Sequence, residues 1–444
     1  MTDNKVLAIK PLLEEGRENE LSGFLRSLHP ADLADALGPL DMEDTIKVMS
    51  LLDIQQAADV LVEMSESSRD IVASSLPLEK LTRMVAEMES DDAADVVGEL
   101  GDDAAREVLS QINSEDGEDV RRLLMYDEDT AGGLMQVELV SALESDTVDE
   151  VIGKIRENRE EVGDVGRVFV VDRAGTLRGE VTLKDLLLAY PGQTMNSLIH
   201  KSPELVLRVD ENQETVAQKF QKYDAQTAPV VDSQNRLLGR VTVDDIIDVV
   251  HEEADKDFYR LAGSSEEELS SQGTLKTVGL RLPWLLFNLG GGLITSFILD
   301  YFEKSLLETM ALVAFVPMVM GLSGAVGSQS ATITVRGLAT GRLAEGQLLK
   351  NIGKEQKVTA FIALAMGLFI ALASGAIHGA LHIGLAVGLS ITAAILVSAF
   401  LGTLTPIFFR RMSVDPALAS GPVVTSTNDV VSLLIYVAVG TAVM

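Results

Sequence analysis

A single carboxylate inside the last apolar stretch of the chain, Asp429, is the residue whose setting most clearly suggests chemistry. It lies in GPVVTSTNDVVSLLIYVAVG, residues 421–440, and the other acids of the C-terminal part fall at the ends of apolar stretches or in loops. A charge at such depth costs roughly 2.5–3.5 kcal/mol, so it normally faces a bundle interior or an ion path. The alternative is a neutral, protonated Asp429 that hydrogen-bonds to Thr425 or Asn428.

A second set of acids lies in helical patterns of the N-terminal part. Asp91 and Asp95 are four residues apart and share a helix face, where like charges destabilise unless they are solvated or matched by a cation. The segment DDIIDVVHEEADKDF carries a stripe, within an arc of about 80°, made of Asp245, Asp248, Glu252 and Asp255. Such a stripe has three possible explanations. It is a solvated helix face, it is part of a halophile-type acidic surface, or divalent cations bridge it to a second acidic surface.

Charge divides the chain into two parts. Residues 1–278 contain 60 Asp and Glu against 27 Lys and Arg, whereas residues 279–444 contain 7 against 9. The acidic part disfavours nucleic acid and attracts cations, and the lack of cysteine excludes disulfides and thiolate metal sites. The N-terminus lacks the apolar core of a signal peptide. The sequence therefore predicts an acidic cytosolic region joined to a membrane domain.

Five apolar stretches are long enough to span a membrane as helices. They run over residues 281–300, 308–334, 357–379, 383–409 and 420–443. Lys and Arg concentrate after the second and fourth stretches, as expected for cytoplasmic loops, which places the C-terminus outside. The second stretch is rich in Gly, Ser and Thr, which suits close helix packing or a water-lined path.

Two repeats organise the N-terminal part. Residues 20–125 repeat an acid–Ala–Asp pattern, as in HPADLADAL and ESDDAADVVGEL, which predicts a helical-repeat domain. Residues 130–250 contain FVVDRAGTLRGEVTLKDLLL and, 60 positions later, PVVDSQNRLLGRVTVDDIID. Each copy predicts strand, turn, strand and helix, with a threonine cap and an aspartate, Asp185 or Asp245, in the first helical turn. The pair resembles tandem CBS (cystathionine β-synthase type) domains. CBS pairs often bind adenosine nucleotides, and the resemblance implies that ATP binds with its ribose on Asp185. The alternative is that Asp185 only caps its helix.

The order of these parts resembles the MgtE family of magnesium channels over essentially the whole chain. The segments that carry the resemblance are DEDTAGGLM at 127–135, RLPWLL at 281–286, SQSATITVRGLAT at 328–340 and VDPALASGPVVT at 414–425. The resemblance implies an acidic helical-repeat N domain at 1–129, tandem CBS domains at 130–250, an acidic connecting (plug) helix at 251–278 and a five-span all-α pore domain at 279–444.

The resemblance also implies the site residues. The family is homodimeric with a pore on the dimer axis, so Asp429 would hold Mg²⁺ there, and Gly421, Thr425 and Asn428 would line the pore. Regulatory Mg²⁺ would bind sensor acids and close the pore. The candidate sensor acids are Asp59, Asp91, Asp95, Glu214, Asp224, Asp245, Asp248, Glu252, Glu253, Asp255 and Asp257, and Lys256 interrupts their run.

We therefore expect a Mg²⁺-selective channel of the bacterial inner membrane, closed by cytosolic Mg²⁺, and not an enzyme. Asn residues typical of the family's second span are replaced by Ala325 and Ser328, so a broader channel for Co²⁺ or Mn²⁺ is one alternative. A non-conducting membrane sensor of Mg²⁺ or nucleotide is another. An intramembrane aspartyl protease needs two carboxylates that share a proton, and a single chain offers one.

Overall fold

The computed structural model describes most of the chain. The described residues are 9–13, 15–112, 114–157, 166–199, 203, 205–265, 268, 274–302, 310–340, 342–343, 348–412, 414–417 and 421–443. They divide into two units, Met1–His251 and Glu252–Met444, and the division falls inside one long helix.

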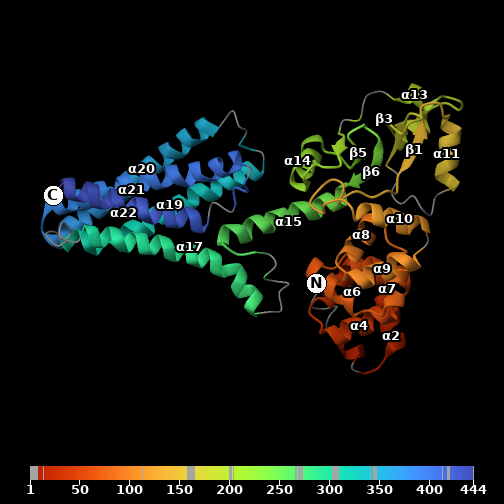
Figure 1. Ribbon diagram of the computed structural model, residues 1–444, viewed down its shortest axis with the longest axis horizontal. Helices are drawn as coiled ribbons and strands as arrows, with labels where there is room; N and C mark the ends of the chain where they lie inside the picture. Colours follow the sequence, from red (N-terminus) through yellow and green to blue (C-terminus); the bar gives the residue numbers. More distant parts are fainter. Residues whose placement is uncertain are drawn as a thin grey trace. The chain divides into compact units, whose positions relative to one another are not determined.

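Short helices form the first part of the first unit (Figure 1). They are α2 (Glu18–Leu25), α3 (Pro30–Leu37), α4 (Met42–Leu51), α5 (Ile54–Val62), α6 (Glu66–Ser75), α7 (Leu78–Val85), α8 (Ser90–Gly98), α9 (Asp102–Gln111) and α10 (Ser114–Leu123). Asp41 and Asp53 cap α4 and α5 by accepting a backbone hydrogen bond at 3.0 Å each. Helices two apart in the chain pack together, such as α3 on α5, α5 on α7 and α6 on α8. The predicted helical repeat is confirmed.

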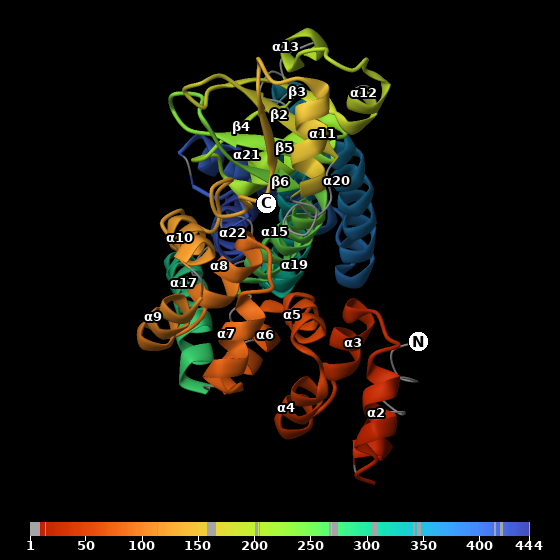
Figure 2. The ribbon, with the colours of Figure 1, turned by 90° about the vertical axis from the view of Figure 1, so that its right-hand side faces the viewer.

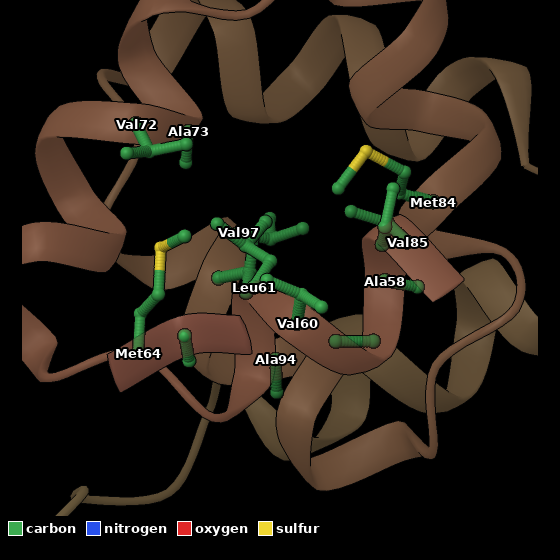
Figure 3. Packing of buried hydrophobic residues seen from close by; sticks show 14 of the residues in the cluster. Ala58, Val60, Leu61, Met64, Val72, Ala73, Met84, Val85, Ala94 and Val97 are labelled. Carbon is green, nitrogen blue, oxygen red and sulfur yellow. The ribbon is translucent and has the colours of Figure 1, made fainter. Parts of the chain in front are cut away.

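The apolar pair in each repeat builds the core of this domain. Figure 3 shows Val60 and Leu61 of α5 with Val97 of α8 and Met84 of α7 in one cluster. None of these four side chains is more than 1 % exposed. Burial of a Val, Leu or Met side chain contributes roughly 1.5–3 kcal/mol relative to its exposure. The helices therefore hold their opposite, acidic faces in fixed positions.

In the second part of the first unit, the described residues form two sheets with the same topology. Their elements are β1 (Val140–Leu143), α11 (Val148–Glu157), β2 (Arg167–Val171), β3 (Leu177–Thr182), α12 (Leu183–Leu188), α13 (Met195–Leu198), β4 (Leu207–Arg208), α14 (Gln213–Tyr223), β5 (Thr227–Val231), β6 (Leu237–Thr242) and α15 (Val243–Ala262). In each sheet the first two strands are parallel and the last two antiparallel. Val148 and Val151 of α11 pack on the first sheet, and both views show the helix beside it (Figure 2).

The two copies also bond to each other. The Leu177 amide donates to the Asn235 carbonyl at 2.9 Å, and the Leu237 amide donates to the Gly175 carbonyl at 3.0 Å. Gly175 and Asn235 both have positive φ, 79° and 62°, so the two hairpin turns match. The predicted CBS pair is confirmed in its strand order and in its repeat.

The described residues of the second unit form five helices that are long and apolar enough to cross a membrane, as predicted. They are α17 (Thr274–Tyr301), α19 (Met310–Ala339), α20 (Leu348–His378), α21 (Leu381–Arg411) and α22 (Pro422–Val443). Helix α21 packs against α19, α20 and α22, whereas α17 packs mainly on α22. Helix α20 begins well before the predicted position 357, because helical hydrogen bonding continues through charged residues that hydropathy excludes from a membrane.

Helix α15 connects the CBS pair to the second unit as one continuous helix from Val243 to Ala262. It ends at Gly263, whose φ of 73° lies in the left-handed region that favours glycine. Helix α17 then begins at Thr274. The segment 251–278, predicted as the connecting helix, thus holds the end of α15 and the start of α17.

Candidate cation sites

Helix α8 begins in a run of acids. Glu89 has an extended backbone before the first helical residue, and Asp91 and Asp92 occupy the first turn. Carboxylates are favourable there because the helix N-terminus carries partial positive charge. On its other face, α8 buries Val96 completely in the domain core. The packing of α8 therefore fixes where its acids lie.

The acids of α8 meet acids of the second CBS domain. We call Glu89, Asp91, Asp92, Asp244 and Asp245 the acidic cluster. Burial, then the charges of Asp245 and Asp92, raises the pKa of Asp91 well above its usual range. Burial, then the charge of Asp245, raises the pKa of Asp92 to about 7. Burial also raises the pKa of Asp245 to about 7, although Thr242 donates a hydrogen bond to it. A divalent cation would neutralise this repulsion.

Polar partners from the chain already compensate part of the acidic cluster. Gln136 Nε2 donates to Glu89 Oε2 at 2.9 Å and to Asp91 Oδ2 at 3.3 Å, while Gln136 Oε1 accepts from Arg240 Nε at 2.8 Å. Gln136 and Arg240 are 2 % and 4 % exposed. Among the described residues, no three Asp, Glu or His side chains form a ready-made cage for a metal. A cation here would keep several waters, as Mg²⁺ commonly does.

Asp95 is exposed and lies at the edge of this region. Its Oδ2 is 3.8 Å from Arg69 Nη2, and Arg69 also pairs with Glu99 at 2.8 Å. An ion pair with an exposed carboxylate contributes about 0–1 kcal/mol to the free energy of unfolding. Asp95 is thus partly matched by a cation of the chain itself, one of the two alternatives that its spacing allowed.

Three other candidate sensor acids make contacts on their own helices. Gln55 Nε2 donates to Asp59 Oδ1 at 3.0 Å, and Gln218 Nε2 donates to Glu214 Oε1 at 3.2 Å. Asp224 ends α14 in the left-handed conformation, with φ of 48°. These contacts do not link the three acids to the acidic cluster, so their sensor role stays a prediction.

The predicted acidic stripe on α15 is only partly open to solvent. Asp248 and Asp255 are exposed. Glu252 and Glu253 form ion pairs with Lys256, at 2.6 and 3.4 Å. The lysine that interrupts the acidic run therefore neutralises part of it.

Asp257, nearer the end of α15, faces the connection between α21 and α22. Burial, then the charge of Asp415, raises the pKa of Asp257 to about 6, and Arg336 opposes that shift. Arg260, on the same helix, forms an ion pair with Asp415. The end of α15 is thus held by charges next to the start of α22.

Gly421 lies where this helix end meets α22. A Cβ at position 421 would lie 2.6 Å from the Leu261 carbonyl oxygen, closer than real contacts allow. A Cβ at Gly263 would lie 3.0 Å from Pro422 Cγ. Glycine, which has no Cβ, therefore permits this close backbone approach at position 421.

Asp429 is half-buried in α22 and lies near α19, since a Cβ on Gly324 would be 3.9 Å from its Oδ1. Thr425 Oγ1 donates to the Gly421 carbonyl at 3.1 Å. Within the described part of α22, neither Thr425 nor Asn428 hydrogen-bonds to Asp429. The geometry therefore gives no support to a locally bonded, neutral Asp429.

Asn428, beside Asp429, is completely buried at the crossing of three helices. Neither its Nδ2 nor its Oδ1 has a hydrogen-bond partner among the described residues. A Cβ on Gly327 would lie 1.8 Å from Asn428 Nδ2, and a Cβ on Gly402 would lie 2.2 Å from the Gly327 carbonyl oxygen. The glycines of α19 and α21 therefore allow close helix packing, one of the two roles predicted for the second span.

The sequence did not identify several residues of the acidic cluster, nor its partners Gln136 and Arg240. Asp92 follows Asp91 directly, so the acidic first turn of α8 was the available signal. No comparable pattern marks Gln136 or Arg240, because their contacts join residues 104 positions apart.

Asp185 takes part in a helix cap. Asp185 Oδ2 accepts a hydrogen bond from Thr182 Oγ1 at 2.7 Å, and the Asp185 amide donates to Thr182 Oγ1 at 3.1 Å. Thr242 Oγ1 donates to Asp245 Oδ2 at the same 2.7 Å. These contacts match the helix-cap alternative, and ribose binding by Asp185 stays a prediction.

Five apolar helices with an acid inside one of them, joined to a CBS pair and an acidic helical domain, define a multi-span membrane transport protein with a regulatory region. Three family models match the chain in the same order: the MgtE intracellular N domain at 28–129, the CBS domain at 131–192 and 198–252, and a divalent cation transporter at 316–439. The chain belongs to the MgtE family of magnesium transporters.

Relatives in two bacteria match nearly end to end. The magnesium transporter MgtE of Thermus thermophilus is 32 % identical, over 99 % of this chain and 98 % of the relative. The magnesium transporter MgtE of Bacillus subtilis is 30 % identical, over 99 % of this chain and 97 % of the relative. A crystal structure of the cytosolic domain of the Mg²⁺ channel MgtE with ATP is 33 % identical, with a TM-score of 0.52, over 55 % of this chain and 99 % of that one.

Proposed function

We propose that the protein is a Mg²⁺ channel that admits magnesium down its electrochemical gradient and that Asp429 is the ion ligand of its pore. The observation that carries the proposal is an aspartate within apolar α22 that lies near the glycine-rich α19, without an ion pair to any described residue. Oxygen ligands suit Mg²⁺, which sheds its waters reluctantly. Gly421 and Thr425 lie at the start of α22 and are proposed to line the path, whereas Asn428 is completely buried between helices of one chain and does not line it.

The pore is completed by a second copy of the chain. One carboxylate neutralises half the charge of a divalent ion, and two carboxylates on a dimer axis neutralise it fully. A membrane potential drives two charges inward with about 4.6 kcal/mol per 100 mV. The mass of the purified protein in detergent tests the homodimer, and a monomer that still conducts would contradict it.

Cytosolic Mg²⁺ closes the channel in this proposal. The acidic cluster brings together carboxyls that repel one another, and a divalent ion between Asp91 and Asp245 relieves the repulsion. Helix α15 carries Asp245 at one end and packs on Gly421 at the other. When Mg²⁺ is scarce, repulsion loosens the α8 contact and α15 releases α22. The remaining proposed sensor acids are Asp59, Asp95, Glu214, Asp224, Asp248, Glu252, Glu253, Asp255 and Asp257.

The N-terminal region lies in the cytosol and the C-terminus outside the bacterial inner membrane. The distribution of Lys and Arg supports this orientation, because the connections after α19 and α21 are basic. The chain contains no cysteine, so single cysteines placed at each terminus can be labelled without background. An impermeant maleimide should label only the C-terminal cysteine in intact cells.

ATP is a proposed ligand of the CBS pair. One structure that is similar to the cytosolic region of this chain, a cytosolic domain of the Mg²⁺ channel MgtE, is a complex with ATP. Asp185 is the proposed ribose ligand, in addition to its role in the helix cap. Calorimetric titration of ATP into the protein and into Asp185→Ala tests the assignment, and equal binding by both would contradict it.

Flux through purified protein in liposomes tests the channel. Asp429→Asn should abolish Mg²⁺ entry and leave the oligomeric state unchanged, whereas Asp300→Asn, at the exposed end of α17, should conduct normally. Normal flux through Asp429→Asn would refute the pore assignment. Parallel assays with Co²⁺ and Mn²⁺ decide whether the replacements at Ala325 and Ser328 broaden selectivity.

A further inference from the structure

A crevice opens at the end of α21, away from Asp429 and from the acidic cluster. It has a volume of about 110 Å³ and is lined by Leu338, Leu343, Leu348, Ile407, Arg410 and Arg411. Three of the apolar residues, Leu338, Leu348 and Ile407, are at most 9 % exposed and form a small apolar cluster of their own. The crevice therefore has an apolar floor and two guanidinium groups at its edge.

The two arginines differ from Arg260 and Arg281 of the second unit. Arg260 pairs with Asp415, and Arg281 pairs with Glu268. In the described part of the chain, neither Arg410 nor Arg411 forms an ion pair. Two adjacent guanidinium groups that form no ion pair with a described residue are suited to a phosphate, which they bind through parallel charge-assisted hydrogen bonds.

The surroundings indicate that the ligand is a lipid. Phe408 and Met412 flank the arginines and are 56 % and 59 % exposed, so this end of α21 presents apolar surface beside its charges. A pocket for a drug-sized molecule has a volume of roughly 300 Å³ or more. A crevice of about 110 Å³ therefore has room for only part of a lipid acyl chain. Basic sites between transmembrane helices at a membrane interface bind anionic headgroups.

We propose that an anionic phospholipid binds here, with its phosphate on Arg410 and Arg411 and the start of one acyl chain in the crevice between Leu338, Leu348 and Ile407. The lipid joins the ends of α19, α20 and α21, which supply these residues. It thereby stabilises the membrane unit. This site is independent of ion conduction, so the proposal holds or fails separately from the channel assignment.

Thermal unfolding of the purified full-length protein in detergent tests the site with three probes. Phosphatidylglycerol should raise the unfolding temperature, whereas phosphatidylcholine and soluble glycerol phosphate at equal concentration should not. An equal rise with phosphatidylcholine would show that the headgroup charge is irrelevant, and an equal rise with glycerol phosphate would show a phosphate site rather than a lipid site. Either result overturns the proposal.

Matched variants locate the binding. Arg410→Gln/Arg411→Gln should weaken the retention of phosphatidylglycerol in native mass spectrometry by about thirtyfold. Lys354→Gln/Lys357→Gln removes the same charge from exposed positions of α20 outside the crevice and should retain the lipid as the wild type does. Equal retention by both double variants would overturn the assignment. The three-probe comparison on the wild type decides the question if the arginine variant fails to fold.

Discussion

Acids occur in two contrasting environments in this protein. In the acidic cluster, carboxyls from α8 and the second CBS domain crowd together, and Gln136 and Arg240 compensate them in part. In α22, Asp429 stands among apolar and small residues, with no other acid in its helix. Burial, and after it the charges of neighbouring acids, raises the pKa values of Asp91, Asp92 and Asp245, so the charge of these three groups depends on pH.

The contrast explains how one residue type serves two proposed roles. A crowded group responds to cations because each bound charge relieves several repulsions at once. A single acid in a pore offers the same ligand to every passing ion. We therefore assign the proposed regulation to the acidic cluster and the proposed conduction to Asp429.

The largest effect is expected where α19 meets α22. Gly327→Ala places a Cβ 1.8 Å from Asn428 Nδ2, so the helices must separate and Mg²⁺ flux should disappear together with a large fall in thermal stability. Gly324→Ala, one turn away, meets only Asp429 Oδ1 at 3.9 Å and should keep the wild-type unfolding temperature. Equal stability of the two variants would show that α19 and α22 do not pack this closely.

Neutralising the acidic cluster should remove the response to Mg²⁺ without removing the fold. Asp91→Asn/Asp92→Asn/Asp245→Asn eliminates repulsion among buried carboxyls, so the unfolding temperature in chelator should rise and millimolar Mg²⁺ should add nothing. Asp102→Asn/Asp103→Asn, at fully exposed positions of α9, is the control and should respond as the wild type does. A Mg²⁺ response that survives in the triple variant would place the sensor elsewhere.

A smaller effect is expected at the contact between α15 and α22. Gly421→Asn adds a Cβ that would lie 2.6 Å from the Leu261 carbonyl oxygen. The end of α15 should move, and closure by Mg²⁺ should become incomplete while flux in low Mg²⁺ is retained. Flux assays at both Mg²⁺ levels measure this, with Gly279→Ala as a control because no atom lies within 4 Å of its Cβ.

The smallest expected effect is a dependence of stability on pH without divalent ions. Asp92 and Asp245 have pKa values near 7 in the folded protein, against 3.8 for the ordinary group. At a pH between 3.8 and about 7, folding therefore takes up protons on these two groups. The unfolding temperature in chelator should consequently fall as the pH rises from 5 to 8. Mg²⁺ should restore stability at pH 8 and do little at pH 5. A flat profile in chelator would contradict the shared burial of these carboxyls.

The sequence predicted the elements of the fold because their signals are local. Hydropathy predicted the five spans, and the 60-residue repeat predicted the matching sheets. The acidic first turn of α8 and the lone Asp429 were also visible. No local pattern encodes contacts between distant segments. Such contacts determine the partners Gln136 and Arg240, the burial of the Asn428 amide without a described partner, and the need for Gly421.

Mg²⁺ flux into liposomes, with Mg²⁺ low or high on the side of the N-terminal region, tests the central claim most directly. The wild type should conduct at low Mg²⁺ and close at high Mg²⁺. Asp429→Asn should conduct at neither level, and the triple variant of the acidic cluster should conduct at both. Closure of the triple variant at high Mg²⁺, or conduction by Asp429→Asn, would contradict the separation of regulation from conduction.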